Sequence, residues 1–388
     1  MCIKNAFVTI LVGVFVLSLP CAALEKEKAI DITRGSTMTL YGAVGDAAFL
    51  RDKDESTKVR FKNGGTVMLK NPHKTATLYL VWDIAPKEWR LHISNWQFGM
   101  GKSRYLHQYV KIPAKPTTIR ISFDGAAVLC EIRQLTNGTP PPDIQEWQPP
   151  LKDADMLLLP THADDEHLYF GGTIPTYTAQ GKAVQVAYMT DHKKEPHRRH
   201  ELLNGLWAAG IRNYPVVSTF PDLYSPSLAH AKTVYDESAW LAYQVELIRR
   251  FSPKVIVGHD ANGEYGHGAH MLNAATLQKA VIAAADKQQY PKSLQKYGAW
   301  DTPKTYLHLW PKNGVVMDWD KPLAAFDGAS AYETAVTAFA HHISQQDYFK
   351  VEQTGPYDCR MFGLYRSTVG EVEKGNDFFE NIRLWEIP

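Results

Sequence analysis

Two polar segments of this 388-residue chain contain residue types that could bind a metal ion. In the first, His162 and Asp165 are three positions apart and directly follow the short apolar run Asp155–Leu159. In the second, His267 and His270 are also three positions apart, and an apolar helical pattern follows them. Side chains at i and i+3 of a helix share a face, so both histidines can reach one site. Two nitrogen ligands and one carboxylate, with an open position for water, form the pattern of a catalytic zinc site.

Such a site indicates hydrolysis, because bound zinc lowers the pKa of water to about 7 and polarises a carbonyl group. The reaction also needs a base for the water and a proton donor for the leaving atom. Asp164, next to Asp165, could be that base, and His267 could be the acid or could stabilise the oxyanion. Each segment alone has a simpler explanation, a solvated acidic turn or a surface histidine pair. Together, each after an apolar run, they favour a metal-dependent hydrolase.

The elements around these segments alternate between strand and helix patterns. Apolar runs predict strands at 155–159, 183–189 and 255–257, and helical spacing appears between them and after the last one. This alternation predicts a mostly parallel sheet in an α/β domain. Loops at the carboxyl ends of such strands carry ligands. We therefore expect a Rossmann-like sheet with both polar segments at one edge.

Residues 36–135 have a different texture, with short β-rich runs and no long helical pattern. The runs are 37–41, 57–61, 66–70, 77–81, 118–123 and 127–132. Asn63-Gly64-Gly65 predicts a hairpin turn between the second and third runs. Regularly spaced short strands predict a β-sandwich. Four aromatic residues of this part are expected mainly in its core, although an exposed one can stack on a sugar: Trp82, Trp89, Trp96 and Tyr105.

The N-terminus has the features of a secretory signal. Lys4 precedes the apolar run Ala6–Leu19, and small residues lead to a cleavage position near Ala23. We therefore expect a secreted or periplasmic protein without a stable membrane span after cleavage. The alternatives are an N-terminal membrane anchor, for which the run is short, and a lipoprotein anchored at Cys21. Without Lys4 the chain has 41 basic and 41 acidic residues and no charge block, which argues against a nucleic-acid partner.

These patterns divide the chain into four parts. They are a signal peptide at 1–23, a β-sandwich at 24–137, a Pro-rich linker at 138–152 and the α/β domain at 153–388. The prolines of the linker block both helix and central strand. Cys130 and Cys359 fall in different parts, and export would permit a disulfide between them without predicting one.

The two polar segments resemble the motifs of the LmbE-like, or PIG-L, family of zinc-dependent N-acetylglucosaminyl deacetylases. His162-Ala163-Asp164-Asp165-Glu166 resembles the family's His-Pro-Asp-Asp-Glu, and Gly266-His267-Gly268-Ala269-His270 resembles its Gly-His-x-x-His. Arg198-Arg199-His200-Glu201 and His342-Ile343-Ser344-Gln345 are similar to two weaker family elements. All four are in the family's order within residues 153–385, and residues 24–150 lie outside the resemblance.

The resemblance implies one Zn²⁺ per chain, or another divalent transition metal, bound by His162, Asp165 and His270. It implies that Asp164 is the general base, and that His267 stabilises the oxyanion or protonates the leaving amine. Further implied roles are assistance to the oxyanion by Tyr265 and contact with polar substrate groups by Arg198. The alternative for Arg198 is a surface residue that pairs with Glu201 or solvent. Glu166, His342 and Gln345 would be supporting residues.

Two positions depart from the family pattern. Ala163 replaces a proline, which should change the stiffness of the loop without removing a ligand. Ala269 replaces an aspartate that tunes the catalytic histidine, so Asp260 or Glu264 could orient His267 instead.

The resulting prediction is hydrolysis of the acetamide of an N-acetylated amino sugar or glycoconjugate, with release of acetate. One alternative is a zinc amidase that acts on another N-acyl group. The other is an inactive, secreted glycan-binding protein.

Overall fold

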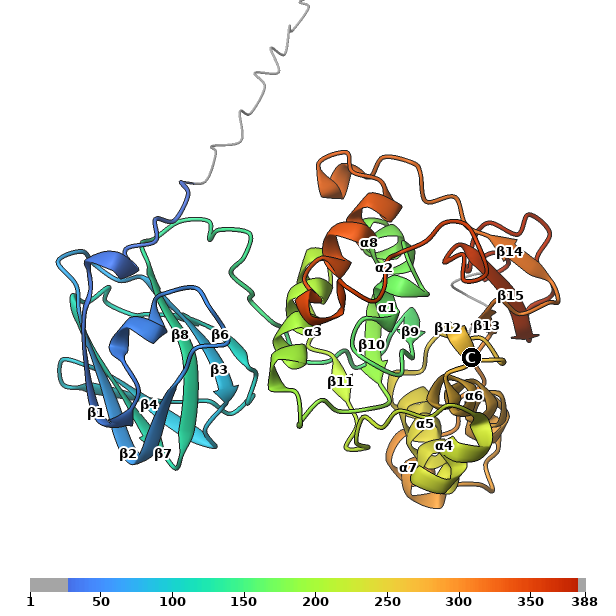
Figure 1. Ribbon diagram of the computed structural model, residues 1–388, viewed down its shortest axis with the longest axis horizontal. Helices are drawn as coiled ribbons and strands as arrows, with labels where there is room; N and C mark the ends of the chain where they lie inside the picture. Colours follow the sequence, from blue (N-terminus) through green and yellow to red (C-terminus); the bar gives the residue numbers. More distant parts are fainter. Residues whose placement is uncertain (1–26, 383–388) are drawn as a thin grey trace, which may run out of the picture.

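The computed structural model describes residues 27–382 and contains two sheets that follow one another along the chain (Figure 1). The predicted signal peptide, 1–23, lies outside the described residues. A mixed α/β chain is thus confirmed. No helix within residues 27–382 combines the length and the hydrophobicity that crossing a membrane requires.

The N-terminal sheet has eight antiparallel strands in the order β5-β4-β7-β2-β8-β3-β6, with β1 paired to β2. The two separate sheets of the predicted β-sandwich are not confirmed for this part of the chain. The first half of β2 pairs with β8 and its second half pairs with β7, which links all the strands into one curled sheet. The strands are β1 (Thr37–Val44), β2 (Val59–Lys70), β3 (Thr77–Ile84), β4 (Glu88–Ile93), β5 (Trp96–Met100), β6 (His107–Lys111), β7 (Thr118–Asp124) and β8 (Ala127–Leu135).

The hairpin predicted at Asn63-Gly64-Gly65 is wrong, because β2 continues through these residues. The pairing of β1 with β2 shifts register at this point, between Tyr41 and Ala43. Gly64 has a φ of 77°, and a Cβ on Gly42 of β1 would lie 3.3 Å from the Gly65 Cα. The glycines therefore permit a bulge and a close approach of two strands, a role that a turn signal in sequence does not distinguish.

The C-terminal sheet has seven strands in the order β11-β10-β9-β12-β13-β15-β14. The first five are parallel, and β15 and β14 are antiparallel to their neighbours. The chain order reverses between β9 and β12, so the loops after these two strands open into one crevice. The strands are β9 (Met156–Leu158), β10 (Val184–Tyr188), β11 (Val216–Val217), β12 (Val255–Gly258), β13 (Lys304–His308), β14 (Gly314–Val316) and β15 (Met361–Ser367).

Helices cover both faces of this sheet (Figure 1). Successive strand side chains point to opposite faces, so Met156 and Leu158 of β9 pack with α1, α2, α3 and α8, whereas Leu157 packs with α5 and α6. The helices are α1 (Asp165–Leu168), α2 (Thr173–Ala179), α3 (Pro196–Ala208), α4 (Leu228–Val234), α5 (Glu237–Phe251), α6 (Gly268–Ala285), α7 (Pro291–Tyr297) and α8 (Ala331–Phe339).

The segment between the sheets is held against α3. Trp147 is buried, and the Trp207 indole of α3 donates a hydrogen bond to the Pro142 carbonyl at 2.9 Å. Cys130 and Cys359 are both buried and form no disulfide.

Candidate metal centre

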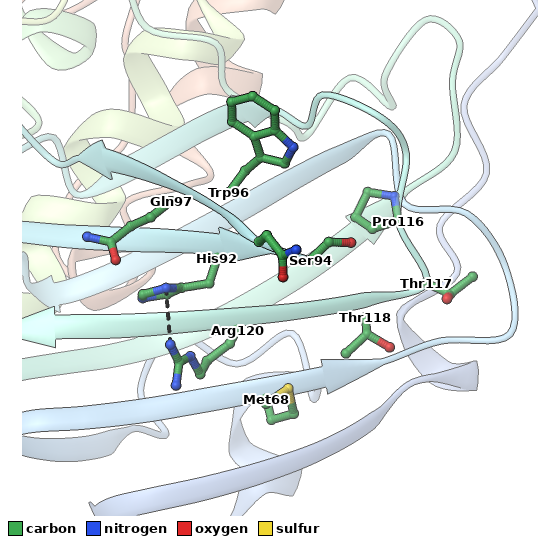
Figure 2. A pocket seen from close by; sticks show the side chains of 10 residues that line it. Met68, His92, Ser94, Trp96, Gln97, Pro116, Thr117, Thr118 and Arg120 are labelled. Carbon is green, nitrogen blue, oxygen red and sulfur yellow. Dashed lines mark hydrogen bonds between the residues drawn. The ribbon is translucent and has the colours of Figure 1, made fainter.

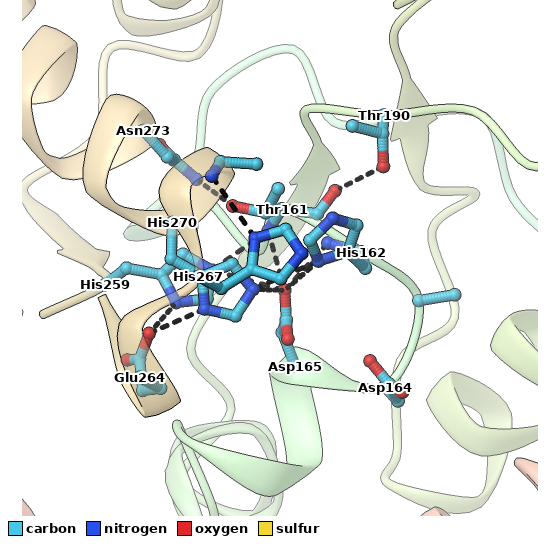
Figure 3. Close-up of polar contacts among 12 residues, drawn as sticks. Thr161, His162, Asp164, Asp165, Thr190, His259, Glu264, His267, His270 and Asn273 are labelled. Atoms are coloured by element: carbon cyan, nitrogen blue, oxygen red, sulfur yellow. Dashed lines mark hydrogen bonds and ion pairs between the residues drawn. The ribbon is translucent and has the colours of Figure 1, made fainter. Parts of the chain in front are cut away.

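The loops after β9 and β12 bring the three predicted ligands together. His162 Nδ1 lies 3.0 Å from His270 Nε2, and Asp165 Oδ2 lies 3.3 Å and 3.4 Å from these two nitrogens. Figure 3 shows these imidazoles gathered around the Asp165 carboxylate. Adjacent ligands of a tetrahedral ion with bonds of about 2.0–2.1 Å are about 3.3 Å apart. The spacing and the donor types therefore fit one zinc ion.

A buried carboxylate fixes the orientation of His270. Glu264 Oε2 accepts a hydrogen bond from His270 Nδ1 at 2.8 Å, which leaves His270 Nε2 directed at Asp165. The same carboxylate accepts 2.8 Å hydrogen bonds from His259 and His308. A carboxylate behind a ligand imidazole sets its tautomer and raises its basicity.

Asp222 is the corresponding group behind His162. Its Oδ1 lies 3.5 Å from His162 Nε2, and its Oδ2 contacts His192 and Arg198 at 3.1 Å and 3.3 Å. Burial alone would raise the pKa of Asp222, but the hydrogen bond from His192 and the nearby positive charges hold it well below its usual range. Asp222 therefore supplies a negative charge beside the three predicted ligands.

Asp164 is buried at the start of α1, beside the Asp165 carboxylate and in an uncommon backbone conformation. Its φ of 115° lies in the region that favours glycine, and such strain is concentrated at functional positions. Burial raises the pKa of Asp164 above its usual range, and the Arg198 guanidinium, 3.2 Å away, acts against that shift. Figure 3 shows the carboxylate to one side of the imidazoles.

Arg198 is buried, so the alternative expectation of a surface residue paired with Glu201 is wrong. Its guanidinium also donates to the Ala163 carbonyl at 2.6 Å and thereby holds the loop after β9. Glu201 instead accepts hydrogen bonds from the Ser344 backbone and hydroxyl at 2.8 Å and 2.7 Å. The two weaker sequence elements thus bind each other.

His267 caps the N-terminus of α6, where its Nδ1 accepts a hydrogen bond from the Ala269 N–H at 3.2 Å. The expectation that Asp260 or Glu264 orients His267 is wrong. Glu264 accepts hydrogen bonds from His259, His270 and His308, and Asp260 accepts one from the Asn262 N–H. Burial and the imidazoles of His162 and His270 lower the pKa of His267 to about 3. A neutral ring with Nδ1 as acceptor carries its proton on Nε2, so His267 can donate a hydrogen bond.

The substitution of alanine for proline at Ala163 supplies a backbone donor. The Ala163 N–H donates to His192 Nε2 at 3.0 Å, a contact that proline cannot make. Because His192 Nδ1 lies against Asp222, this contact links the loop after β9 to the carboxylate behind His162.

Tyr265 lies between the histidines and a cavity that is lined mainly by aromatic side chains. Its ring centroid is 5.5 Å from His267 and 5.6 Å from His270, and its φ is 45°. Tyr265 is 41% exposed as a residue, but desolvation and the surrounding carboxylates raise the pKa of its hydroxyl, which stays protonated. It borders a cavity of about 160 Å³ that is lined by Leu168, Tyr169, Tyr265, Tyr348, Phe349, Lys350, Glu352 and Tyr357.

Glu166 holds the loop after β9 through contacts with Asp164 and His342. Its Oε2 accepts a hydrogen bond from the Asp164 N–H at 2.9 Å, and its Oε1 lies 3.2 Å from His342 Nε2. Gln345 donates a hydrogen bond to the Ser344 hydroxyl. These contacts agree with a supporting role for the late histidine element.

Sequence reasoning missed four residues of this centre. His259 directly follows β12 and His308 ends β13, so their positions after apolar strands could have indicated them. His192 and Asp222 lie in loops without a motif, and their proximity depends on the fold.

Another cavity lies on the N-terminal sheet, away from this centre (Figure 2). It has a volume of about 660 Å³, and Met68, His92 and Arg120 project into it from neighbouring strands. Trp82 and Trp89 are fully buried, as expected for the core, whereas Trp96 at the rim is 73% exposed.

Comparison with known proteins finds a matching family and relatives for the C-terminal part of the chain. Residues 157–284 match the PIG-L family, described as GlcNAc-PI de-N-acetylase. Two relatives are each named 1D-myo-inositol 2-acetamido-2-deoxy-alpha-D-glucopyranoside deacetylase. The relative from Geodermatophilus obscurus is 27% identical over 46% of this chain and 68% of its own length. The relative from Rhodococcus erythropolis is 28% identical over 41% of this chain and 62% of its own length.

Among solved structures, an N,N'-diacetylchitobiose deacetylase from Pyrococcus horikoshii matches 50% of this chain and 72% of its own. The sequence identity is 19% and the TM-score is 0.40. The predicted family resemblance is confirmed, and at the level of the family so is a hydrolase that acts on acetamides.

Proposed function

Because residues 157–284 belong to the PIG-L family, we propose that the protein is a zinc-dependent hydrolase that deacetylates an N-acetylated amino sugar. The substrate would be of the N-acetylglucosamine type, and acetate would be released. The observation that carries the proposal is the convergence of His162 Nδ1, Asp165 Oδ2 and His270 Nε2 beside a buried second carboxylate, Asp164. The order of the parallel strands also supports a Rossmann-like name for the C-terminal sheet.

The residues of the chain divide the work as follows. His162, Asp165 and His270 would hold the zinc ion, which when bound supplies a Lewis acid and a water of lowered pKa. Asp164 would accept the proton of the attacking water, with Arg198 holding its carboxylate in place at 3.2 Å. The same carboxyl group would then give that proton to the leaving amine as the C–N bond breaks.

His267 would donate the hydrogen bond from Nε2 to the oxygen of the acetyl group as negative charge develops there. Tyr265, with its protonated hydroxyl and its position against the His267 ring, would support that oxygen from the aromatic side. Exposed Tyr348 and the neighbouring Phe349 offer flat faces on which a sugar ring can pack.

The test is an acetate-release screen with the zinc-loaded full chain. Substrates would include N,N'-diacetylchitobiose, an N-acetylglucosaminyl inositol and longer chitooligosaccharides, and non-sugar N-acyl amides would test the amidase alternative. Release from the sugars that disappears on removal of zinc is the expected result. Release from the non-sugar amides alone would replace the proposal with the amidase.

We further propose that the N-terminal sheet binds glycan, because Trp96 is exposed beside a large cavity with polar lining. Trp96→Ala should weaken binding of chitooligosaccharides roughly tenfold in calorimetry. The matched control is Tyr41→Ala, which removes another exposed aromatic ring from the same sheet. Equal affinities for both variants and the wild type would refute this site.

Export of the chain, with cleavage near Ala23, remains part of the proposal. N-terminal sequencing of the protein from the culture medium or periplasm would test it.

A further inference from the structure

A cluster of oxygen atoms surrounds the hydroxyl of Thr57, in the loop between the 3-10 helix Ala47–Leu50 and β2. Thr57 Oγ1 lies 2.9 Å from Asp52 Oδ2, 3.0 Å from the Asp54 carbonyl oxygen and 3.3 Å from the Phe49 carbonyl oxygen. A hydroxyl group has one proton and can donate to one of these three acceptors. The Thr57 N–H donates to the Asp54 carbonyl oxygen at 3.2 Å. Its hydroxyl can therefore donate to Asp52 or to Phe49 but not to both, which leaves one crowded oxygen without a donor from Thr57.

Glu131 of β8 adds a second carboxylate next to Asp52. Its side chain is buried with 3% exposure, and its Oε1 accepts a hydrogen bond from the Lys53 N–H of the same loop. Its Oε2 is buried and has no hydrogen-bond partner among the described residues. Glu131 and Asp52 line one surface cavity of about 260 Å³. An unpaired, buried carboxylate oxygen is costly, so this atom indicates a missing ligand.

Glu131 has no ion-pair partner among the described residues, although Arg34, Arg51 and Lys53 line the same cavity. Burial raises the pKa of Glu131 to about 8, and charge repulsion from the adjacent Asp52 carboxylate acts in the same direction. Arg133, two positions along β8, is engaged by Asp31 at 2.9 Å and by Asp143. A cation between Asp52 and Glu131 would relieve this repulsion.

The donor set indicates which cation would bind. All the available atoms are oxygens, from two carboxylates, two backbone carbonyls and one hydroxyl, which is the set that Ca²⁺ prefers and zinc does not. Ligands at 2.3–2.6 Å from an ion lie about 3 Å from one another, and the oxygens around Thr57 have this spacing. We propose that this loop binds one calcium ion through oxygen atoms of Phe49, Asp52, Asp54, Thr57 and Glu131.

The position of the loop gives the ion a structural consequence. Glu55, inside the same loop, accepts a hydrogen bond from Asn204 of α3 at 3.1 Å. An ion that fixes Asp52, Asp54 and Thr57 would also fix Glu55 and would order one contact between the two sheets.

Equilibrium dialysis of the zinc-loaded full chain against radioactive calcium tests the proposal. We expect one Ca²⁺ per chain at millimolar calcium, a concentration at which extracellular calcium sites fill. Asp52→Asn changes an exposed residue and should preserve the fold, yet it should weaken calcium binding at least tenfold. Glu131→Gln should do the same.

Two controls separate this site from others. Asp124→Asn removes a partly exposed carboxylate of the same sheet, which pairs with Arg90 at 2.7 Å, and should leave calcium binding unchanged. His270→Ala alters the metal centre and should also retain the calcium ion. The proposal is overturned if wild type binds no calcium at 5 mM, about five times the weakest expected dissociation constant. It is equally overturned if Asp52→Asn and Glu131→Gln bind like wild type, or if His270→Ala abolishes binding.

Discussion

Several clusters of the described residues bring histidine and carboxylate groups to close range, and two of them differ in the hydrogen-bond partners of their histidines. One is the candidate metal centre, which contains His162, Asp165 and His270 and is called the metal centre below. The other, which we call the interface cluster, joins Glu55 and His107 of the N-terminal part to His200 of α3. The metal centre has its carboxylate oxygen within 3.4 Å of both nitrogens. In the interface cluster the Glu55 carboxylate is 3.9 Å from His107 Nε2.

The hydrogen bonds explain why similar residues need not have similar chemistry. His107 Nδ1 lies 2.6 Å from the Tyr79 hydroxyl and its Nε2 lies 3.0 Å from His200 Nδ1. One proton between these two nitrogens satisfies both, so the interface cluster needs no cation. In the metal centre, Glu264 behind His270 and Asp222 behind His162 direct the opposite nitrogens toward a common point. The supporting carboxylates, rather than the histidines alone, mark a metal site.

The sharpest way to break this comparison is to remove one histidine from each cluster. His270→Ala should reduce the zinc content of the purified protein from one per chain to near zero and abolish acetate release, because two ligands rarely retain the ion. His107→Ala, the matched variant, should retain one zinc per chain. Elemental analysis of both purified variants measures their zinc content. Loss of zinc from His107→Ala but not from His270→Ala would show that the interface cluster, and not the metal centre, binds the ion.

The next largest effect is expected at Asp164. Asp164→Asn keeps the shape of the side chain and removes the base, so turnover should fall by roughly 10²–10⁴-fold while zinc content stays at one. The control is Glu195→Gln, which removes an exposed carboxylate 3.9 Å from the same Arg198 guanidinium. If both variants keep the wild-type rate of acetate release, another group is the base.

A smaller effect on zinc affinity should distinguish the two carboxylates that lie next to the histidines, Glu264 in the metal centre and Glu55 in the interface cluster. Glu264→Gln leaves an oxygen that can accept from His270 but removes its charge, so zinc affinity should fall about 10–100-fold. Glu55→Gln in the interface cluster should leave zinc affinity unchanged. Competition with a chromogenic chelator measures both, and an unaltered affinity in Glu264→Gln would show that its charge is irrelevant to the metal.

The sequence predicted which residues of the candidate metal centre lie together where local spacing determines it, and their binding of a metal ion stays a prediction. His162, Asp165, His267 and His270 lie in short motifs after apolar strands, where a helix start or a tight loop fixes their relative directions. Asp222 could not be predicted, because it lies 60 positions after His162 in the sequence and approaches it only through the packing of β10 and β11. The wrong hairpin prediction at the glycines of β2 has the same cause. The strand that pairs with them, β1, determines whether a turn or a bulge forms there.

The smallest effect expected is an acid sensitivity of the interface cluster. Burial, followed by the charge of Arg199, lowers the pKa of His200 to about 4, from an ordinary value of 6.5. Both states are neutral above pH 6.5, whereas below it the unfolded chain binds a proton that the folded chain does not. Stability is therefore lost as the pH falls from 6.5 toward 4, by about 1.4 kcal/mol at pH 5.5 for this one group.

Replacement of His200 by asparagine isolates that contribution, because the asparagine amide occupies the place of Nδ1 opposite His107 and does not titrate. The fall in the free energy of unfolding between pH 7.5 and pH 5.5, measured with urea, should be about 1.4 kcal/mol smaller in His200→Asn than in wild type. His230→Asn, which changes an exposed histidine of α4, should leave the fall as large as in wild type. If His200→Asn has the same acid sensitivity as His230→Asn, then His200 is charged in the folded protein. The interface cluster would then carry a positive charge that Glu55 could balance, and the contrast with the metal centre would rest on distance alone.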